Sequence, residues 1–399
     1  MQHATRRATS LLKTLPRPAN STNPRSLSCS TDGRGYQHGC IDVHTHCYLP
    51  RYMDMLRARG ATSDVPYVAA GATPTADERY VILPGEDKDS TSAIGRPIGE
   101  EYFSVAEKLR YMDRHGIDVS VLSLANPWLD FLPADDAVAM ATLLNDDLQE
   151  ISSDSSGRIY GFGVLPTQDV AAACKEVERM SKSADKVRGV ILGTSGAGKG
   201  LDDPTLDPLY ESLAAHNMPV FLHPHYGLGN EHYANTGHSL FLALGFPFET
   251  TMAMSRLILS GAFDRHPNLK FLLAHAGGTL PFLSGRLDSC VEHDHEMCDK
   301  LDKPFSHYLK ENCYYDSVIY HTPALKSVID MVGADKLMFG TDNPFFPPPG
   351  KGARSGEEWV STSKNMDAID GLGDKKIADD IIWGNAARVL GIDIEAVGK

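Results

Sequence analysis

Residues 41–46 read Ile-Asp-Val-His-Thr-His, a short apolar run that ends in two histidines, His44 and His46. Successive side chains of a β-strand point to opposite faces, so these two imidazoles would point to the same side. Two imidazoles at the carboxyl end of one strand make half of a metal site. The alternative is a polar strand end with solvated histidines, because two-residue matches often arise by chance.

Further short apolar runs follow, and helical patterns separate them. The candidate strands are 40–44, 117–124, 159–165, 187–193, 219–223, 270–275, 313–319 and 336–341. Several are rich in Val, Ile and Leu without polar alternation, which is typical of parallel strands covered on both faces. Helical patterns occupy 102–115, 134–154, 169–183, 206–217, 248–264, 279–293, 322–333, 359–369 and 374–390. Eight strands separated by helices predict an α/β fold, a (β/α)8 TIM barrel, with a doubly wound open sheet as the alternative.

Two connections are unusually long. Residues 49–101, with a weak strand at 80–83, and residues 224–247 predict insertions in the first and fifth βα loops. Both would lie over the carboxyl rim of the barrel, where such barrels place their active sites. We expect residues 39–399 to form a single barrel domain.

Composition excludes several classes of protein. The chain has 399 residues, 42% of them hydrophobic, and a net charge of −14, which argues against a general nucleic-acid binder. No apolar run approaches the roughly 18 residues that a membrane span requires. The seven cysteines include no Cys-x-x-Cys pair, so neither a disulfide framework nor a thiolate zinc site is expected.

The first 38 residues differ from the rest. They carry six basic residues and one acid, Asp32, among many Ser, Thr, Asn and Pro residues. Such a leader resembles a mitochondrial transit peptide, and the alternative is a disordered extension. The predicted location is therefore cytoplasmic or mitochondrial.

Other candidate site residues fall at strand ends. His223 and His275 end predicted strands, and Asp342 directly follows one. With His44 and His46 they would converge on one mouth of a barrel. Imidazole and carboxylate together suit Zn²⁺, Mn²⁺ or Fe²⁺. Each of these residues alone could have a purely structural role, a histidine in the core or an aspartate as a helix cap. Because all of them fall at the carboxyl ends of strands, together they predict a metal site.

This arrangement resembles the amidohydrolase superfamily, which has His-x-His after strand 1, His after strands 5 and 6, and Asp after strand 8. Many dinuclear members use a carboxylated lysine on strand 4, and residues 187–193 contain no lysine. The resemblance therefore implies one metal ion rather than two.

Longer sequence segments narrow the resemblance to one group of this superfamily. They resemble the isoorotate (uracil-5-carboxylate) decarboxylases, which are non-oxidative decarboxylases related to aminocarboxymuconate-semialdehyde decarboxylase, and the similarity runs from about residue 40 to 391. The segments that carry the resemblance are SLANPWLDFL (123–132), GVILGTSGAGKGLDDP (189–204), VFLHPHYGL (220–228), LALGFPFETT (242–251), LLAHAGGTLPFLSGRLDSC (272–290) and LMFGTDNPFFPP (337–348).

The resemblance implies roles for individual residues. The metal ligands would be His44, His46, His223 and Asp342, holding one divalent ion, Zn²⁺ first and Mn²⁺ as the alternative. Around the substrate it places Arg96, Asn126, His275 and Phe345. In the expected chemistry Asp342 delivers a proton to C5, and His275 orients the substrate or relays the proton. Arg96 pairs with anionic oxygens, and Phe345 packs on the ring.

One position departs from the pattern. Asn343 follows Asp342, where this group is expected to have His, and neighbouring positions of the loop touch substrate. The ring-substituent preference is therefore open.

The predicted reaction is conversion of uracil-5-carboxylate to uracil and CO₂, in pyrimidine or thymidine salvage. The alternatives are a decarboxylase of another aromatic acid such as a dihydroxybenzoate, a metal-dependent amidohydrolase or lactonase, and a non-catalytic scaffold. Relatives suggest a homodimer. The acidic net charge and the lack of a long apolar run predict that the protein binds neither nucleic acid nor membrane.

Overall fold

A computed structural model describes residues 39–62, 64–71, 77–82, 95–183, 186–195, 198–233, 235–236, 238–348 and 357–393. The predicted leader, residues 1–38, lies outside these ranges, so the domain division at residue 39 stays a prediction. No helix among the described residues is both long enough and apolar enough to cross a membrane.

Eight parallel strands form one sheet, in which each strand lies beside the next in chain order. All eight runs predicted from the sequence are strands, so the barrel prediction is confirmed. Their side chains are almost all buried on both faces, which explains why the runs lack polar alternation. The strands are β1 (Ile41–His46), β5 (Val119–Ser123), β6 (Ile159–Val164), β7 (Val187–Gly193), β8 (Val220–His223), β9 (Phe271–Leu273), β10 (Cys313–Asp316) and β11 (Leu337–Met338).

Hydrogen bonds between β1 and the segment that follows β11 close the barrel. The Val43 N–H donates to the Phe339 carbonyl (3.0 Å), and the His46 N–H donates to the Asn343 carbonyl (2.8 Å). Thr45 pairs with Asn343 as an isolated parallel bridge. This seam brings the His-x-His strand against the segment that carries Asp342.

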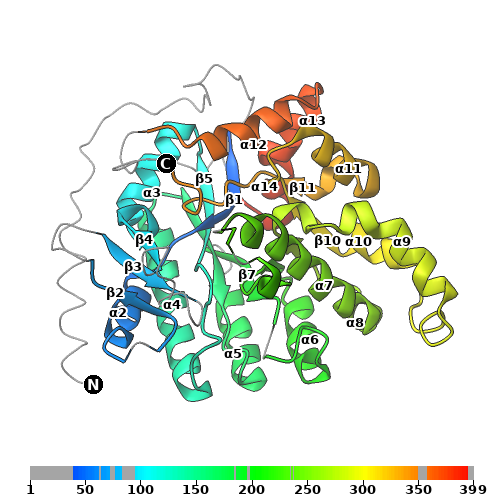
Figure 1. The fold of residues 1–399 in the computed structure, drawn as a ribbon, viewed down its shortest axis with the longest axis horizontal. Coiled ribbons are helices and arrows are strands. Elements are labelled where there is room, and N and C mark those ends of the chain that lie inside the picture. Colours follow the sequence, from blue (N-terminus) through cyan, green and yellow to red (C-terminus); the bar gives the residue numbers. More distant parts are fainter. Residues whose placement is uncertain are drawn as a thin grey trace.

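The helices lie outside the strands (Figure 1). They begin and end where local chemistry allows: the Ser104 hydroxyl accepts the Glu107 N–H, and Gly116 ends the same helix with φ of +66°. The connecting helices are α3 (Val105–His115), α4 (Ala134–Asp154), α5 (Val170–Ser181), α6 (Asp207–Ala215), α7 (Phe246–Leu259), α8 (Ala262–Arg265), α9 (Leu280–His293), α10 (Phe305–Glu311) and α11 (Thr322–Val332). After the last strand come α12 (Val360–Asp370), α13 (Lys375–Asp379) and α14 (Asn385–Leu390).

Four features differ from the sequence prediction. The helix predicted over 248–264 is divided into α7 and α8, because Gly261 between them has φ of +73°. The helix predicted over 374–390 is α13 and α14 joined through a π-helical turn at Asp380–Gly384. The short helix α10 was not predicted. The first insertion contains a helix, α2 (Pro50–Arg59), and an antiparallel sheet of β2 (Tyr67–Ala69), β3 (Glu78–Val81) and β4 (Arg96–Ile98). Only β3 had a counterpart in the sequence pattern, because three- and four-residue strands are too short to show periodicity.

Candidate metal centre and substrate cavity

Two histidines at the end of β1 meet a carboxylate from the barrel seam. The Nε2 atoms of His44 and His46 lie 3.1 Å apart. Asp342 Oδ1 lies 3.3 Å from His44 Nε2 and 3.5 Å from His46 Nε2. The β1–β5 register shifts between Asp42 and Thr45, and such irregularities commonly re-aim side chains beside active sites.

Two further imidazoles complete the cluster. The ring centroid of His223 lies 5.1 Å from that of His44 and 4.8 Å from that of His46. His275 Nε2 lies 3.5 Å from Asp342 Oδ2. Ligand atoms of His44, His223, His275 and Asp342 all lie within 4.8 Å of one another. The structure therefore brings all five sequence-predicted residues together, and it places His275 as near the centre as the expected ligands.

Outer hydrogen bonds set the orientation of three imidazoles. His44 Nδ1 contacts Asp316 Oδ2 (2.5 Å), His46 Nδ1 contacts Ser123 Oγ (2.8 Å), and His223 Nδ1 contacts the Pro224 carbonyl (2.7 Å). A ring whose Nδ1–H donates outward presents the Nε2 lone pair inward. This is the usual arrangement of metal-binding histidines.

The pKa values of the cluster residues are shifted by burial and by their mutual charges. Burial alone would lower the pKa of His44, but the charges of Asp342 and Asp316 outweigh it and raise the pKa to about 10. Burial lowers the pKa of His46 to about 4 and holds the pKa of His223 well below its ordinary value. Burial would raise the pKa of Asp342, yet the His44 charge and hydrogen bonds from His275 and His44 keep it well below its usual range. A cation bound at the cluster would compete with a proton for the inward-facing nitrogen of His44.

One atom tests directly whether these residues fit a metal ion. His223 Nε2 is buried and has no hydrogen-bond partner among the described residues. An unpaired buried acceptor is costly, and a bound cation at the cluster would satisfy it. The donor set of imidazole nitrogens and carboxylate oxygen fits one divalent ion.

The cluster opens into a cavity of about 460 Å³. Both predicted insertions reach it, since Arg96 comes from β4 and His238 to Pro247 come from the fifth loop. All four residues expected around the substrate line it: Arg96, Asn126, His275 and Phe345.

Two of the predicted substrate residues place a cation beside an aromatic ring on the cavity wall. The Arg96 guanidinium lies over the Phe345 ring, 4.7 Å from its centroid. Its Nη1 atom is buried without a hydrogen-bond partner among the described residues. Asn126 Nδ2 contacts His225 Nδ1 (2.8 Å), which fixes the amide at the cavity wall. An unpaired buried guanidinium N–H calls for an anionic oxygen.

Left-handed backbone marks the cavity mouth. His275, Tyr320 and Asp342 line the cavity with φ of +54°, +57° and +57°. Such conformations are uncommon for residues other than glycine, cost roughly 1–3 kcal/mol each, and cluster at functional sites.

Sequence reasoning missed two residues. Asp316, fully buried at the end of β10, holds His44 and also accepts the N–H groups of His275 (3.1 Å) and Ala276 (2.9 Å). An aspartate at the end of an otherwise apolar strand was the available signal. Tyr320 lines the cavity, and its hydroxyl is buried without a partner among the described residues.

Asn343, the one position that departs from the expected pattern, lies beside the site but not on the cavity wall. Its side chain turns away from the cavity toward Lys108, and it is absent from the residues that line the cavity. The departure at residue 343 therefore does not alter a residue of the cavity wall, and the ring-substituent preference stays open.

Comparisons with known proteins agree with this site. The family model described as Amidohydrolase matches residues 41–392, so the chain belongs to the amidohydrolase family. A solved apo structure of IDCase, an isoorotate decarboxylase, from Metarhizium anisopliae is 41% identical with a TM-score of 0.83, covering 89% of this chain and 97% of that one. The 2-amino-3-carboxymuconate-6-semialdehyde decarboxylase of Dictyostelium discoideum is 29% identical, covering 88% of this chain and 92% of the relative.

A more distant likeness concerns the fold alone. The dihydroxybenzoic acid decarboxylase of Polaromonas sp. JS666, solved with bound manganese, has a TM-score of 0.68 at 23% identity, covering 91% of this chain and 100% of that one. Within the amidohydrolase family the chain is a decarboxylase, a carboxy-lyase. The resemblance inferred from the sequence is thus confirmed.

Proposed function

We propose that this decarboxylase converts uracil-5-carboxylate to uracil and CO₂. The observation that carries the proposal is one cavity that presents both the histidine–aspartate cluster and the unpaired Arg96 N–H, in a chain 41% identical to an isoorotate decarboxylase. A planar, anionic ring with adjacent carboxylate and carbonyl oxygens matches both features.

We assign the metal to His44, His46, His223 and Asp342, with His275 near enough to contribute. Zn²⁺ is our first choice and Mn²⁺ the alternative, since nitrogen and oxygen ligands hold both. A bound divalent ion would polarise the substrate oxygens and fix the carboxylate in place.

Substrate binding follows from the cavity walls. Arg96 donates its free N–H to an anionic oxygen, and its rigid fork suits this better than a lysine would. Phe345, already stacked beneath the guanidinium, packs on the ring face. Asn126, also on the cavity wall, contacts the edge of the ring.

Asp342 and His275 handle the proton. The bond between C5 and the carboxylate breaks, the electron pair stays on C5, and a proton from the Asp342 carboxyl replaces CO₂. Because a metal ligand must be deprotonated, the Asp342 carboxylate has to take up a proton within each cycle before it can give one to C5. His275 Nε2, 3.5 Å from Asp342 Oδ2 and on the cavity wall, relays that proton from solvent to Asp342 and is itself reprotonated by solvent. General-acid steps of this kind contribute roughly 10²–10⁴-fold.

A dihydroxybenzoate is the second candidate substrate. Much of the cavity wall is apolar, including Leu242, Phe246 and Ile319, and would accept a benzene ring as readily as a pyrimidine. An amidohydrolase or lactonase activity has less support, because the relatives compared above are decarboxylases.

A substrate comparison tests the proposal. Metal-replete protein should form uracil from uracil-5-carboxylate, with kcat/KM above that for 2,6-dihydroxybenzoate. The reverse order would move the assignment to the benzoate. Asp342→Asn should lose at least about 10²-fold in kcat, and full activity of this variant would remove the proton-donor role.

We also propose a homodimer in solution. Apolar side chains are exposed on the fifth-loop insertion and α7 and at the start of α9: Leu240, Leu244, Phe248, Met252 and Phe282, of which Phe282 is 85% exposed. Light scattering should give twice the chain mass, and a monomer would contradict this. Residues 1–38 remain our predicted leader, which a fluorescent fusion with and without them would test.

A further inference from the structure

We infer that Lys108, on α3, is a positioning residue that ties together the two segments carrying the metal ligands. The inference rests on the proposed metal site. It concerns a buried lysine to which neither the sequence pattern nor the proposed chemistry gives a role.

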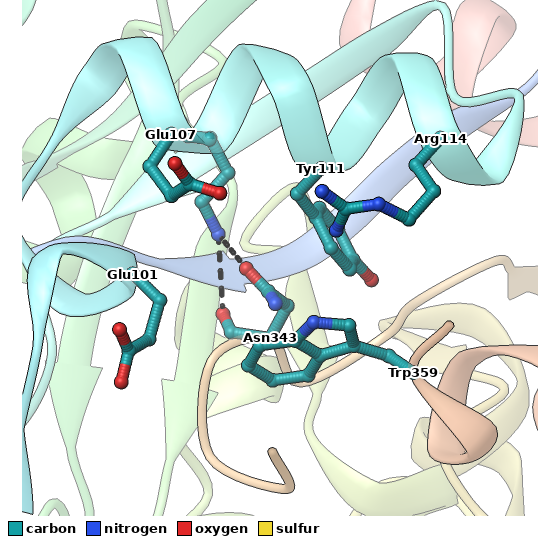
Figure 2. A pocket seen from close by; sticks show the side chains of 7 residues that line it. Glu101, Glu107, Tyr111, Arg114, Asn343 and Trp359 are labelled. Carbon is teal, nitrogen blue, oxygen red and sulfur yellow. Dashed lines mark hydrogen bonds between the residues drawn. The ribbon is translucent and has the colours of Figure 1, made fainter. Parts of the chain in front are cut away.

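Lys108 is 2% exposed, and its ammonium group reaches the barrel seam. Nζ donates to Thr45 Oγ1 (2.6 Å), to the Asn343 side-chain oxygen, and to the Asn343 carbonyl (3.4 Å). Figure 2 shows both contacts to Asn343 as dashed lines, beside a small hollow lined by Glu101, Glu107, Tyr111, Arg114 and Trp359. An ammonium has three N–H donors, so these contacts use all of them.

The partners of Lys108 lie next to proposed metal ligands on both sides of the seam. Thr45 lies between His44 and His46, and Asn343 directly follows Asp342. The Asn343 carbonyl also accepts the His46 N–H (2.8 Å) and the Thr45 hydroxyl (3.2 Å). One ammonium group therefore joins the His-x-His strand to the Asp342 loop.

The Asp342 loop needs such a tie. Asp342 has φ of +57°, a conformation that persists only where surrounding contacts enforce it. On one side the Asp342 N–H donates to the His44 carbonyl (2.8 Å). On the other side the contacts from Lys108 hold Asn343, so the residue carrying the carboxylate is fixed at both ends.

Stability alone is a poor explanation for this lysine. Among the described residues no carboxylate lies within ion-pair distance of Lys108, and Glu107 beside it pairs with Arg110. Its other partner is the Tyr111 ring, 5.5 Å from Nζ. Burying a cation whose direct hydrogen-bond partners are neutral oxygens is costly, and apolar residues of similar size often serve stability as well or better. A purely structural lysine could thus be replaced by methionine without effect on the ligands.

The test uses cobalt as a spectroscopic probe of the metal site. Lys108→Met, Lys108→Arg and Asn343→Ala are compared with wild type by the visible absorption of the Co²⁺-loaded protein, the rate of Co²⁺ loss to a chelator, and kcat and KM. Asn145→Ala is the matched control, because Asn145 is also buried but bonds to Val164 and Glu176 in another part of the barrel. Melting temperatures are recorded for all variants.

We expect Lys108→Met and Asn343→Ala to shift the cobalt spectrum, to release Co²⁺ about 10–100-fold faster, and to lose up to about 10²-fold in kcat. KM should change much less, and Lys108→Arg should recover part of the loss. Asn145→Ala should lower the melting temperature and leave the spectrum unchanged.

An unchanged spectrum and unchanged kcat in Lys108→Met would overturn the inference. If Lys108→Met does not fold, the spectrum and kcat of Asn343→Ala test the inference instead. That substitution removes only the side-chain contact between Asn343 and Lys108 and keeps the backbone hydrogen bonds of the seam. If wild type binds no Co²⁺, the proposed metal site itself fails and the inference with it. If wild type binds Co²⁺ and the variants keep its cobalt spectrum and kcat, only the role of Lys108 is refuted.

Discussion

Replacing Asp316 by asparagine should disable the metal site without touching a proposed ligand. The buried Asp316 carboxylate accepts His44 Nδ1–H (2.5 Å) and the His275 N–H (3.1 Å) at Oδ2, and the N–H groups of Ala276 (2.9 Å) and Val318 (3.0 Å) at Oδ1. Asparagine keeps only one oxygen, so two of these N–H groups would face an NH₂ group.

The magnitude follows from these contacts. Hydrogen bonds to a charged group are worth about 1.5–3 kcal/mol each, so losing two costs about 3–6 kcal/mol of stability as an upper range. The effect on the metal comes from the tautomer of His44. If the new NH₂ group faces Nδ1, that nitrogen must accept, the ring proton moves to Nε2, and the lone pair aimed at the cluster is lost. Outer-partner substitutions of this kind weaken metal binding about 10–100-fold.

Competition with a fluorescent chelator measures this loss, alongside thermal unfolding. Glu176→Gln is the control, because Glu176 is a buried carboxylate that accepts from Asn145 Nδ2 (2.7 Å) and lies on α5. It should lower stability and leave metal affinity unchanged. If Asp316→Asn kept wild-type metal affinity, the reasoning about His44 would be refuted.

Three further predictions concern the cavity and its surroundings. Arg96→Leu should raise KM about 10–100-fold, the equivalent of one charge-assisted hydrogen bond, and steady-state kinetics showing an unchanged KM would contradict the anion-binding role. Tyr320→Phe should raise KM up to about 10-fold because its buried hydroxyl lacks a partner among the described residues, and an unaltered KM would mean that substrate does not satisfy it. Burial raises the pKa of Asp130 from 3.8 to about 7, so its folded-state carboxyl stays protonated and stability falls as pH rises from about 4 to 7. Asp130→Asn should therefore raise the melting temperature at pH 8 relative to wild type but not below pH 4, and equal gains at both pH values would contradict this.

Much of the fold was predictable because the barrel strands are buried on both faces. Continuous apolar runs such as Val187–Gly193 and Val220–His223 stand out against helical patterns, and the rule that strand ends share one rim then places His223 beside His44. The antiparallel sheet of the first insertion stayed hidden, since Tyr67–Ala69 and Arg96–Ile98 are too short to show a period.

Residues that act through other residues were beyond sequence reasoning. Asp316 lies within a run that reads simply as a strand, and its bond to His44 spans 272 positions. Lys108 lies in a helix that reads as amphipathic, where a lysine is ordinarily solvated. The sequence related Asn343 only to the neighbouring positions of its loop. The direction of its side chain depends on Lys108, which lies close to it only in the folded barrel.

Decarboxylation by this protein should depend on a single bound metal ion. Uracil formation from uracil-5-carboxylate should be measured on chelator-treated protein as Zn²⁺ or Mn²⁺ is added back stepwise. We predict that activity is absent without metal, rises linearly, and reaches its plateau at about one equivalent per chain, as a site without a strand-4 lysine requires. Full activity in metal-free protein, or no uracil at any metal loading, would contradict the account.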